Sequence, residues 1–497
     1  MAAQISEKTN LALQAQKASN VHVEDIKSSE LLDAKGGNYS GATAKTDEVE
    51  IRLVRKLDLR IMPILWMMYF LNYLDRNAIA NARLNNLEED LHLVGTQYNT
   101  CISILFIGYL LMQIPSNMFM SSPKIRPSLF MSVCMASWAI VSALTALTKN
   151  YVSLVLVRFF LGVTEAPFYP GALFLLSLFY TRKEIALRIS ILYTGNIVAT
   201  AVAGLIAAAT FATLDQKHNL KGWQWLFIIE GVVTFLIAAL GLLMLPDHPL
   251  TTRWLTPAER QLAHDRITRD TVAHAAPGPE TSRTWTALRD ALRDPRLYLL
   301  AFMQNMHLSA CSFNNFFPTV VGSLGFDRTM TLVLTCPPYL VSGVCSVIIG
   351  MASGRYNERT WHITSSMGLA VIGFVIACLT LNTAARYLAC FLFASGAYAV
   401  NSVILGWVSA TLGQTPQKKA ASRSVVNVVA NASYVYTAYL YPKSDGPRYL
   451  VAMSANAAFG VLTIASAWGL RGWLRRTNRA IREGRVPGGD ERVLYAY

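Results

Sequence analysis

Long apolar stretches alternate with short polar connections along most of the chain. A helix needs about 20 mostly apolar residues to cross a bilayer, and the stretches between residues 58 and 471 have that length and character. They predict membrane-spanning helices at 58–80, 97–119, 127–147, 151–175, 187–210, 223–245, 297–321, 330–352, 361–381, 386–410, 421–441 and 449–471. The expected fold class is therefore all-α integral membrane, with twelve transmembrane helices.

One long polar break divides these spans into two sets of six. It contains TPAE, a helix-capping pattern, and APGPE, a turn-rich stretch. Six spans, a linker and six spans are typical of a transporter built from two six-helix bundles with internal repeats. We expect a disordered cytoplasmic tail at 1–57, an N-terminal bundle at 58–245, a cytoplasmic linker at 246–296, a C-terminal bundle at 297–471 and a cytoplasmic tail at 472–497.

Composition and charge agree with a membrane protein. The chain is 53% hydrophobic and only 15% charged, against about 25% charged in an average soluble protein. Of its 44 Lys and Arg residues, 33 fall on one side of the expected membrane and 8 on the other. Because positive residues collect on the cytoplasmic side, both termini are expected to be cytoplasmic. The net charge of +14 is then explained by topology and by contact with anionic membrane lipid, so nucleic acid is not an expected partner.

Enzyme and metal chemistry find little support in the sequence. The seven cysteines lie in apolar stretches without a C-x-x-C pair, and neither H-x-x-x-H nor H-E-x-x-H occurs. Only His307 among the eight histidines lies well inside an expected span, where a buried structural histidine is the simpler interpretation. We expect no enzyme activity, no metal and no cofactor.

The first expected span contains an acidic and a basic residue side by side, Asp75 and Arg76 in NYLDRN. A charge at the centre of a bilayer costs roughly 2.5–3.5 kcal/mol on insertion scales, so a charge in a span is a candidate for function. The alternative is that the helix ends early and both charges lie among the lipid headgroups. Against this, the following AIANARL remains compatible with a helix.

The fourth expected span carries a second charged pair, Arg158 and Glu165 in RFFLGVTEAPFYPG. Seven residues along a helix return to nearly the same face, about 10.5 Å apart along the axis. Both side chains can therefore line one cavity, although a purely structural ion pair between spans 1 and 4 is the alternative. Several Gly and Pro residues make this helix irregular, which membranes tolerate where protein or water satisfies the backbone.

Polar side chains in the second half are candidates for solute binding. Span 7 carries a stripe of them, and later spans and span 6 add others. A stripe of this kind binds solute or hydrogen-bonds neighbouring helices, and the residues alone favour neither interpretation. The candidates are Gln304, Asn305, His307, Asn314, Asn315, Asn401, Asn427, Asn431, Tyr434 and Tyr436, with Glu230 as a further gating or packing charge.

Several segments together resemble the major facilitator superfamily, and within it the fungal allantoate permease family of the anion:cation symporters. They include NYLDR, RFFLGVTEAPFYPG, GWQWLFIIEG, LPDHPLTTRWLTPAER, SGRYNERTWH and YPKSDGPRY. The resemblance covers residues from about 50 to 470 and is specific to the family but not to a substrate. Two departures stand out: KIRPS replaces the usual loop 2–3 signature, and Gly354 stands where an Asp is usual, which puts the charge network of the inner gate in doubt.

The resemblance implies two six-helix bundles, alternating access and uptake of an organic anion with protons. In related symporters the Asp-Arg of span 1 and the Arg and Glu of span 4 bind the anion and carry the proton. Carried over, Arg76 and Arg158 bind the substrate, whereas Asp75 and Glu165 couple the proton. From the polar side chains of the second half we add Gln304, Asn314 and Asn401 as expected substrate-binding residues.

We therefore expect a secondary active transporter that takes up a small organic anion with protons, as a monomer in the plasma membrane. Suitable substrates include vitamin-like acids, such as nicotinate or pantothenate, and allantoate-like compounds. Two alternatives remain open: an exporter of a secondary metabolite on the same fold, and a nutrient receptor that does not transport. The sequence determines neither the substrate nor the direction.

Overall fold

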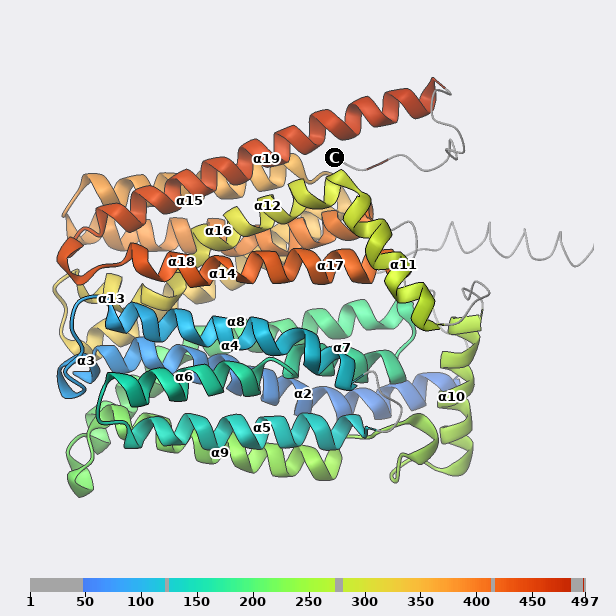
Figure 1. Ribbon diagram of the computed structural model, residues 1–497, viewed down its shortest axis with the longest axis horizontal. Coiled ribbons are helices and arrows are strands. Elements are labelled where there is room, and N and C mark those ends of the chain that lie inside the picture. The colour runs from blue at the N-terminus through green and yellow to red at the C-terminus, as the bar shows by residue number, and fades with distance from the viewer. Residues whose placement is uncertain (1–47, 121–124, 273–279, 413–415, 484–494, 496–497) are drawn as a thin grey trace, which may run out of the picture.

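Long α-helices form nearly all of the described part of the chain in this computed structural model (Figure 1). The structure describes residues 48–120, 125–272, 280–412, 416–483 and 495. Within these residues, eight helical segments are long and apolar enough to cross a membrane by length and composition. They are Pro127–Leu147, Tyr151–Phe179, Leu187–Leu214, Gly222–Met244, Arg328–Arg355, Thr360–Leu379, Thr383–Thr411 and Leu450–Arg482.

All twelve expected spans coincide with helices. In the first half these are α2(Glu48–Arg83), α4(Gln97–Met120), α5(Pro127–Leu144), α6(Tyr151–Glu165) with α7(Phe168–Phe179), α8(Arg182–Leu214) and α9(Gly222–Met244). In the second half they are α12(Pro295–Ala310) with the 3-10 helix η4(Cys311–Phe316) and α13(Phe317–Gly322), α14(Arg328–Arg355), α15(Thr360–Leu379), α16(Thr383–Thr411), α17(Pro416–Asn431) with α18(Ser433–Thr437), and α19(Leu450–Arg482). The expected spans 58–80, 97–119, 297–321 and 421–441 are not among the eight segments.

The ends of the chain differ in extent from the expected tails. Helix α2 begins at Glu48, ten residues before the expected span, and α19 continues to Arg482, well beyond the expected end at 471. Up to residue 47, the expected N-terminal tail lies outside the described residues, as do most of the positions after 483.

The helices form two layers that follow the order of the chain. Helices α2 to α9 form the lower group in Figure 1 and α12 to α19 the upper group, and α10(Pro257–Val272) and α11(Glu280–Arg293) connect them at one end. We call this the linker end, and the opposite end, near α3(Leu87–Asp90) and α13, the far end. The two groups meet where α8 packs against α14 and where α18 packs against α4.

Glycines allow the closest helix pairs to approach within each group. A Cβ on Gly162 of α6 would lie 2.0 Å from the carbonyl oxygen of Leu105 in α4, and a Cβ on Gly108 would lie 2.4 Å from that of Phe159. In the second group, a Cβ on Gly396 would lie 2.4 Å from the carbonyl oxygen of Ser366. Without a hydrophobic driving force between helices in lipid, such close backbone packing is a main source of their association.

Apolar side chains cover the outside of both groups. Leu243 is 81% exposed and Leu379 76% exposed, and many other Leu, Ile, Val and Phe side chains on these helices also face outward. Exposed apolar surface of this extent is unfavourable in water but suits a hydrocarbon environment. The fold therefore agrees with the multi-pass membrane protein expected from hydropathy.

Ion pairs fix the linker to the first group. Arg266 of α10 donates to Glu50 of α2 at 2.7 Å and to Glu184 of α8 at 2.6 Å. Lys56 of α2 pairs with Glu259 of α10 at 2.7 Å. These contacts connect helices that are distant in sequence, so the first part of the linker is an integral part of the linker end.

In the second group, Asp294 at the start of α12 has a similar anchoring role. Its carboxylate caps α12 by accepting from the backbone N–H of Arg296 and also accepts from Lys418 of α17 at 2.9 Å. Burial raises the pKa of Asp294, but hydrogen bonds from Arg296 and Lys418 outweigh burial and lower the pKa to about 2. The carboxylate therefore stays ionised at physiological pH and holds α12 to α17.

Candidate functional site

A central cavity lies between the two groups of helices. Its volume is about 180 Å³, more than ten times the roughly 10–15 Å³ that admits one water molecule. Its wall is made of aromatic and amide side chains from both halves. The lining residues are Tyr69, Asn72, Tyr73, Arg76, Asn77, Phe106, Tyr109, Tyr169, Tyr193, Asn196, Thr200, Gln304, His307, Leu308, Cys311, Asn314, Asn315, Tyr398, Asn401, Leu405, Asn427, Asn431 and Tyr434.

Arg76 is the single Lys or Arg among these described lining residues, which include no Asp or Glu. Its guanidinium lies over the rings of Tyr73, at 5.4 Å, and Tyr109, at 4.8 Å. Aromatic rings stabilise a cation electrostatically and hold it in one orientation. The cavity therefore presents one fixed positive charge to a solute.

A carboxylate holds Arg76 from behind. The Nε of Arg76 donates to Oε2 of Glu165 at 2.6 Å, and the side chains are 17% and 0% exposed, respectively. Glu165 is the last residue of α6, and Pro167, which has no N–H to donate, follows at the break before α7. The irregular span 4 expected from its Gly and Pro residues is confirmed, and the break places Glu165 beside α2.

Asp75 faces away from the cavity, although it is the sequence neighbour of Arg76. It is fully buried and accepts hydrogen bonds from Trp138 at 3.0 Å, Ser142 at 3.3 Å and Thr234 at 3.4 Å. Neighbouring residues on a helix point about 100° apart, so Asp75 reaches α5 and α9 while Arg76 reaches the cavity. The structure thus separates two residues that the sequence had grouped.

Arg158 is also buried away from the cavity wall. It is 2% exposed, its Nη1 has no hydrogen-bond partner, and its Nε lies 3.5 Å from the carbonyl oxygen of Cys101. Among the described residues it makes no ion pair within 4.0 Å. Arg158 therefore does not reach the cavity in this structure, in contrast to the expectation that it binds the substrate.

Two expected binding residues of the second half contact each other at the cavity wall. Gln304 of α12 donates to Asn401 of α16 at 2.7 Å, and Asn401 donates to the hydroxyl of Tyr193 in α8 at 3.1 Å. The chain of amides therefore bridges the two halves. The side-chain oxygen of Gln304 has no partner, which leaves an acceptor available at the cavity.

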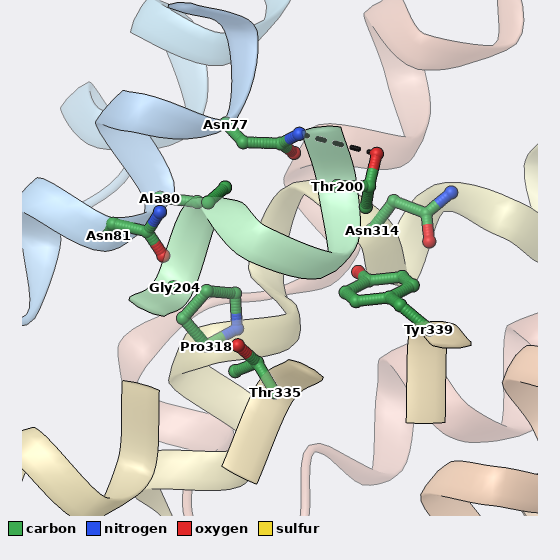
Figure 2. Close-up of a pocket in the computed structure, with 10 residues that line it drawn as sticks. Asn77, Ala80, Asn81, Thr200, Gly204, Asn314, Pro318, Thr335 and Tyr339 are labelled. Atoms are coloured by element: carbon green, nitrogen blue, oxygen red, sulfur yellow. Dashed lines mark hydrogen bonds between the residues drawn. The ribbon is translucent and has the colours of Figure 1, made fainter. Parts of the chain in front are cut away.

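Asn314 lines both the central cavity and a smaller space on its far-end side. This smaller space of about 10 Å³ admits roughly one water molecule. Figure 2 shows its residues, with Asn77 of α2 bonded to Thr200 of α8 at 3.4 Å and Asn314 beside Tyr339 of α14. The side-chain oxygen of Asn314 is buried without a partner, so this polar space continues the cavity toward the far end.

His307 faces the cavity with one nitrogen committed and one without a partner. Its Nε2 lies 2.8 Å from the carbonyl oxygen of Ala397, whereas Nδ1 is buried without a hydrogen bond. A carbonyl accepts only, so Nε2 carries the proton and Nδ1 is left as an acceptor. His307 is therefore buried, as expected, and in addition its Nδ1 is an acceptor without a partner at the cavity wall.

The tyrosines are the residues that the sequence did not single out. Seven of the lining residues are tyrosines, of which only Tyr434 was a candidate: Tyr69, Tyr73, Tyr109, Tyr169, Tyr193, Tyr398 and Tyr434. They come from α2, α4, α7, α8, α16 and α18, so no spacing along one helix indicates that they converge.

Direct contacts between the halves close the far end. Asn99 and Ser103 of α4 donate to the carbonyl oxygens of Ala438, at 2.6 Å, and Val435, at 2.7 Å. Lys443 pairs with Glu88 at 3.1 Å. At the linker end, by contrast, the ion pairs described above join helices of one half to each other or to the linker.

The comparisons with known proteins agree with this architecture. The Major Facilitator Superfamily model matches residues 65–438, which is most of the chain. This chain belongs to the major facilitator superfamily. The resemblance expected from the sequence motifs is thereby confirmed, as is an all-helical membrane fold with two helical bundles.

Fungal relatives of this superfamily member match along most of their length. The major facilitator-type transporter hxnP of Emericella nidulans is 32% identical over 439 residues, which cover 87% of each chain. The high-affinity nicotinic acid transporter of Saccharomyces cerevisiae is 28% identical over 428 residues, covering 85% of this chain and 78% of the yeast protein. These relatives are transporters, so the expectation that this superfamily member is a transporter and not an enzyme is confirmed.

Solved structures show the same fold. A bacterial homolog of the human lysosomal transporter Spinster, in an inward-facing and unoccupied conformation, has a TM-score of 0.65 at 16% identity and covers 82% of this chain and 95% of that one. A D-xylose-proton symporter has a TM-score of 0.63 at 15% identity and covers 82% and 97%. At these identities the likeness establishes the fold.

Proposed function

We propose that this transporter takes up a small organic monocarboxylate together with protons. The observation that carries the proposal is the pair formed by Arg76 and Glu165 at 2.6 Å, with Arg76 at the cavity wall and Glu165 fully buried behind it. Arginine pairs with a carboxylate through two parallel hydrogen bonds. A substrate carboxylate and Glu165 therefore compete for the same cation.

This competition links the anion to a proton. When the substrate carboxylate pairs with Arg76, the ion pair of Glu165 weakens and its buried carboxylate loses its main stabilising partner. A buried carboxylate without such a partner favours its protonated form. Glu165 then takes up a proton, and the loaded site carries a neutral combination of anion and proton across the membrane.

The cavity supports a small, flat and singly charged substrate. One Arg balances one carboxylate, and the lining contains no Lys or Asp among its described residues that would select a second charge. Tyrosine rings offer stacking surfaces to an aromatic or conjugated body. Amides of Gln304, Asn314 and Asn401, together with Nδ1 of His307, offer hydrogen bonds to its polar atoms. The nicotinic acid transporter among the relatives transports a compound of this description.

We also propose the topology and location. The linker end carries the excess of Lys and Arg, so the positive-inside rule places it in the cytoplasm with both termini. The far end then faces outward and is closed here. A domain division at 58–245, 246–296 and 297–471, a plasma-membrane location and a monomeric state complete the proposal.

Uptake of radiolabelled organic acids tests the substrate class. We expect cells that express the chain to accumulate one or more monocarboxylates of a panel with nicotinate, pantothenate, allantoate and a dipeptide, faster at about pH 5 than at about pH 7.5, because protons drive the cycle. Cells without the gene provide the baseline. Lower accumulation of a preloaded acid in expressing cells would instead indicate export, and no difference for any compound would contradict the proposal.

A glycine at the α8–α14 contact, where the two halves meet, gives a conformational prediction. A Cβ on Gly204 would lie 2.3 Å from Oγ1 of Thr335 and 2.4 Å from the carbonyl oxygen of Leu332. We expect Gly204→Ala to open the far end, because the backbone of α14 must move away. The measurement is labelling of Cys311, a cavity residue, by a membrane-impermeant thiol reagent added to intact cells.

A matched variant separates this effect from a general change in helix stability. Gly406 of α16 has no neighbour within 4 Å of an added Cβ, so Gly406→Ala should label like the wild type. The background from other cysteines is given by Cys311→Ser in each variant. Equal labelling of Cys311 in wild type and Gly204→Ala would contradict the role of this contact.

A further inference from the structure

A second acidic site lies behind the cavity wall, between α2, α5 and α9. Asp75 of α2 and Glu230 of α9 are 0% and 3% exposed. Thr234, one helical turn after Glu230, donates to Asp75 at 3.4 Å, so both carboxyl groups lie at the same level of the bundle. The mechanism proposed for Arg76 and Glu165 does not use Glu230.

The two carboxyl groups have very different surroundings. Asp75 accepts three hydrogen bonds, from Trp138, Ser142 and Thr234. Oε2 of Glu230 is buried without a partner, and no hydrogen bond or ion pair of Glu230 is found among the described residues. Hydrogen bonds to a carboxylate favour the ionised form, whereas burial without them favours the protonated form. A proton shared by this pair therefore resides on Glu230.

Charge balance in the first bundle leads to the same assignment. Its buried charged residues around the cavity wall are Asp75, Arg76, Arg158, Glu165 and Glu230, which are three acids and two arginines. With one proton on an acid, the cluster is neutral, and without it the cluster carries one unbalanced negative charge in a low-dielectric region. Since Glu165 is paired with Arg76, Glu230 is the acid without compensation.

Among the described residues, the other elements packed around this pair bring no further carboxyl group to it. Helix α5 contributes Cys134 as its single titratable side chain, and α8 has its charged residues at the linker end in the segment 182–188 and Tyr193 at the cavity. The short helix η1(Thr145–Leu147) has none. On α2, the charged residues at this level are Asp75 and Arg76, and Asp75 interacts electrostatically with both Glu165 and Glu230.

We propose that Glu230 holds a second transported proton, which reaches the cavity wall through Asp75 and Glu165. The inference rests on the proposed proton-coupled uptake. A protonated Glu230 passes its proton to the ionised Asp75, and Asp75 passes it to Glu165 after that residue has released its own proton. Each cycle then moves one monocarboxylate with two protons, so one net positive charge crosses the membrane.

Transport by purified protein in liposomes tests this stoichiometry. The probe is the carboxylate of the panel with the highest uptake rate, nicotinate being tried first, and a pH dye reports proton influx. For the wild type we expect two protons per anion and faster uptake under an inside-negative potential imposed with potassium and valinomycin. For Glu230→Gln we expect half as many protons per anion and no response to the potential, because the neutral amide cannot exchange a proton.

Two further variants distinguish a proton site from a structural role. Glu230→Asp keeps a carboxyl group and should keep the wild-type ratio of protons to anion. Glu259→Gln removes a carboxylate of the linker, paired with Lys56, and should also keep it. A merely structural Glu230 would lower the amount of active protein in Glu230→Gln without changing this ratio.

The outcomes for the two proposals are distinguishable. A wild type that takes up the anion with protons in a ratio of one overturns the second proton, as does Glu230→Gln with the full wild-type ratio and potential response. A wild type whose uptake is independent of pH overturns the proposed function itself, and with it this inference.

Discussion

Replacement of Arg76 by lysine is expected to reduce uptake by roughly tenfold or more, because the cavity keeps a positive charge but loses the planar guanidinium group. A charge-assisted hydrogen bond contributes about 1.5–3 kcal/mol, and about 1.4 kcal/mol corresponds to a factor of ten in affinity. Lysine keeps the charge but offers neither two parallel donors nor a planar group between Tyr73 and Tyr109. The measurement is the initial rate of uptake against substrate concentration, in which KM should rise.

The control for this variant is an arginine of the same helix. Arg60 of α2 lies over the ring of Trp254 at 5.0 Å, toward the linker end, so Arg60→Lys should retain the wild-type KM. Arg76→Gln alone would leave Glu165 buried without a cation, which costs about 3–5 kcal/mol, and the Arg76→Gln/Glu165→Gln pair should restore the amount of protein in the membrane but not uptake. An Arg76→Lys variant with the wild-type KM would contradict carboxylate binding at Arg76.

Replacement of Glu165 by glutamine is expected to separate binding from proton coupling. Glutamine is nearly the same size and cannot ionise, so Arg76 no longer has a competing carboxylate. We expect a lower KM, uptake that no longer depends on pH, and loss of accumulation against a gradient. Exchange of labelled for unlabelled substrate should persist, because it requires the anion to bind and cross but no net proton transfer.

The sign of the pH effect follows from the competition for Arg76. In the wild type, acidification helps Glu165 to release Arg76 and speeds uptake, so the rate falls as pH rises. In Glu165→Gln this release is permanent, and the rate should be the same at about pH 5 and about pH 7.5. Glu259→Gln, in which a linker carboxylate is lost, should keep the wild-type pH profile. A wild-type pH profile in Glu165→Gln would remove Glu165 from the coupling mechanism.

Hydropathy predicted the helices of this fold because the membrane itself imposes a local rule. Every backbone N–H and C=O in hydrocarbon must be paired within the segment, so an apolar stretch of sufficient length becomes a helix whatever its neighbours are. The expected spans 223–245 and 361–381 therefore match α9 and α15 within about two residues. The prediction missed the start of α2, because residues 48–57 are helical but polar and do not belong to the apolar pattern.

The candidate site was only partly predictable. Charges in apolar stretches identified Arg76 and Glu165, since an isolated charge in a span is costly without a partner. The same argument grouped Asp75 and Arg158 with them, but Asp75 faces α5 and α9, and Arg158 lies off the cavity wall. The direction in which each side chain points depends on helix rotation and on the break at Pro167, which residue spacing does not specify.

The sequence by itself determined the membrane class, the order of the spans, the position of the linker and the presence of intramembrane charges, because each depends on local polarity against a bilayer of fixed thickness. Only the tertiary structure decided how the buried charges are paired. Arg76 forms an ion pair with Glu165, and Asp75 is an electrostatic neighbour of Glu230. It also brought seven tyrosines of six helices to one cavity and closed the far end through contacts between the halves, such as those of Asn99 with Ala438 and of Ser103 with Val435. These features arise from contacts between helices far apart in the chain, and packing of backbones and side chains in three dimensions fixes them.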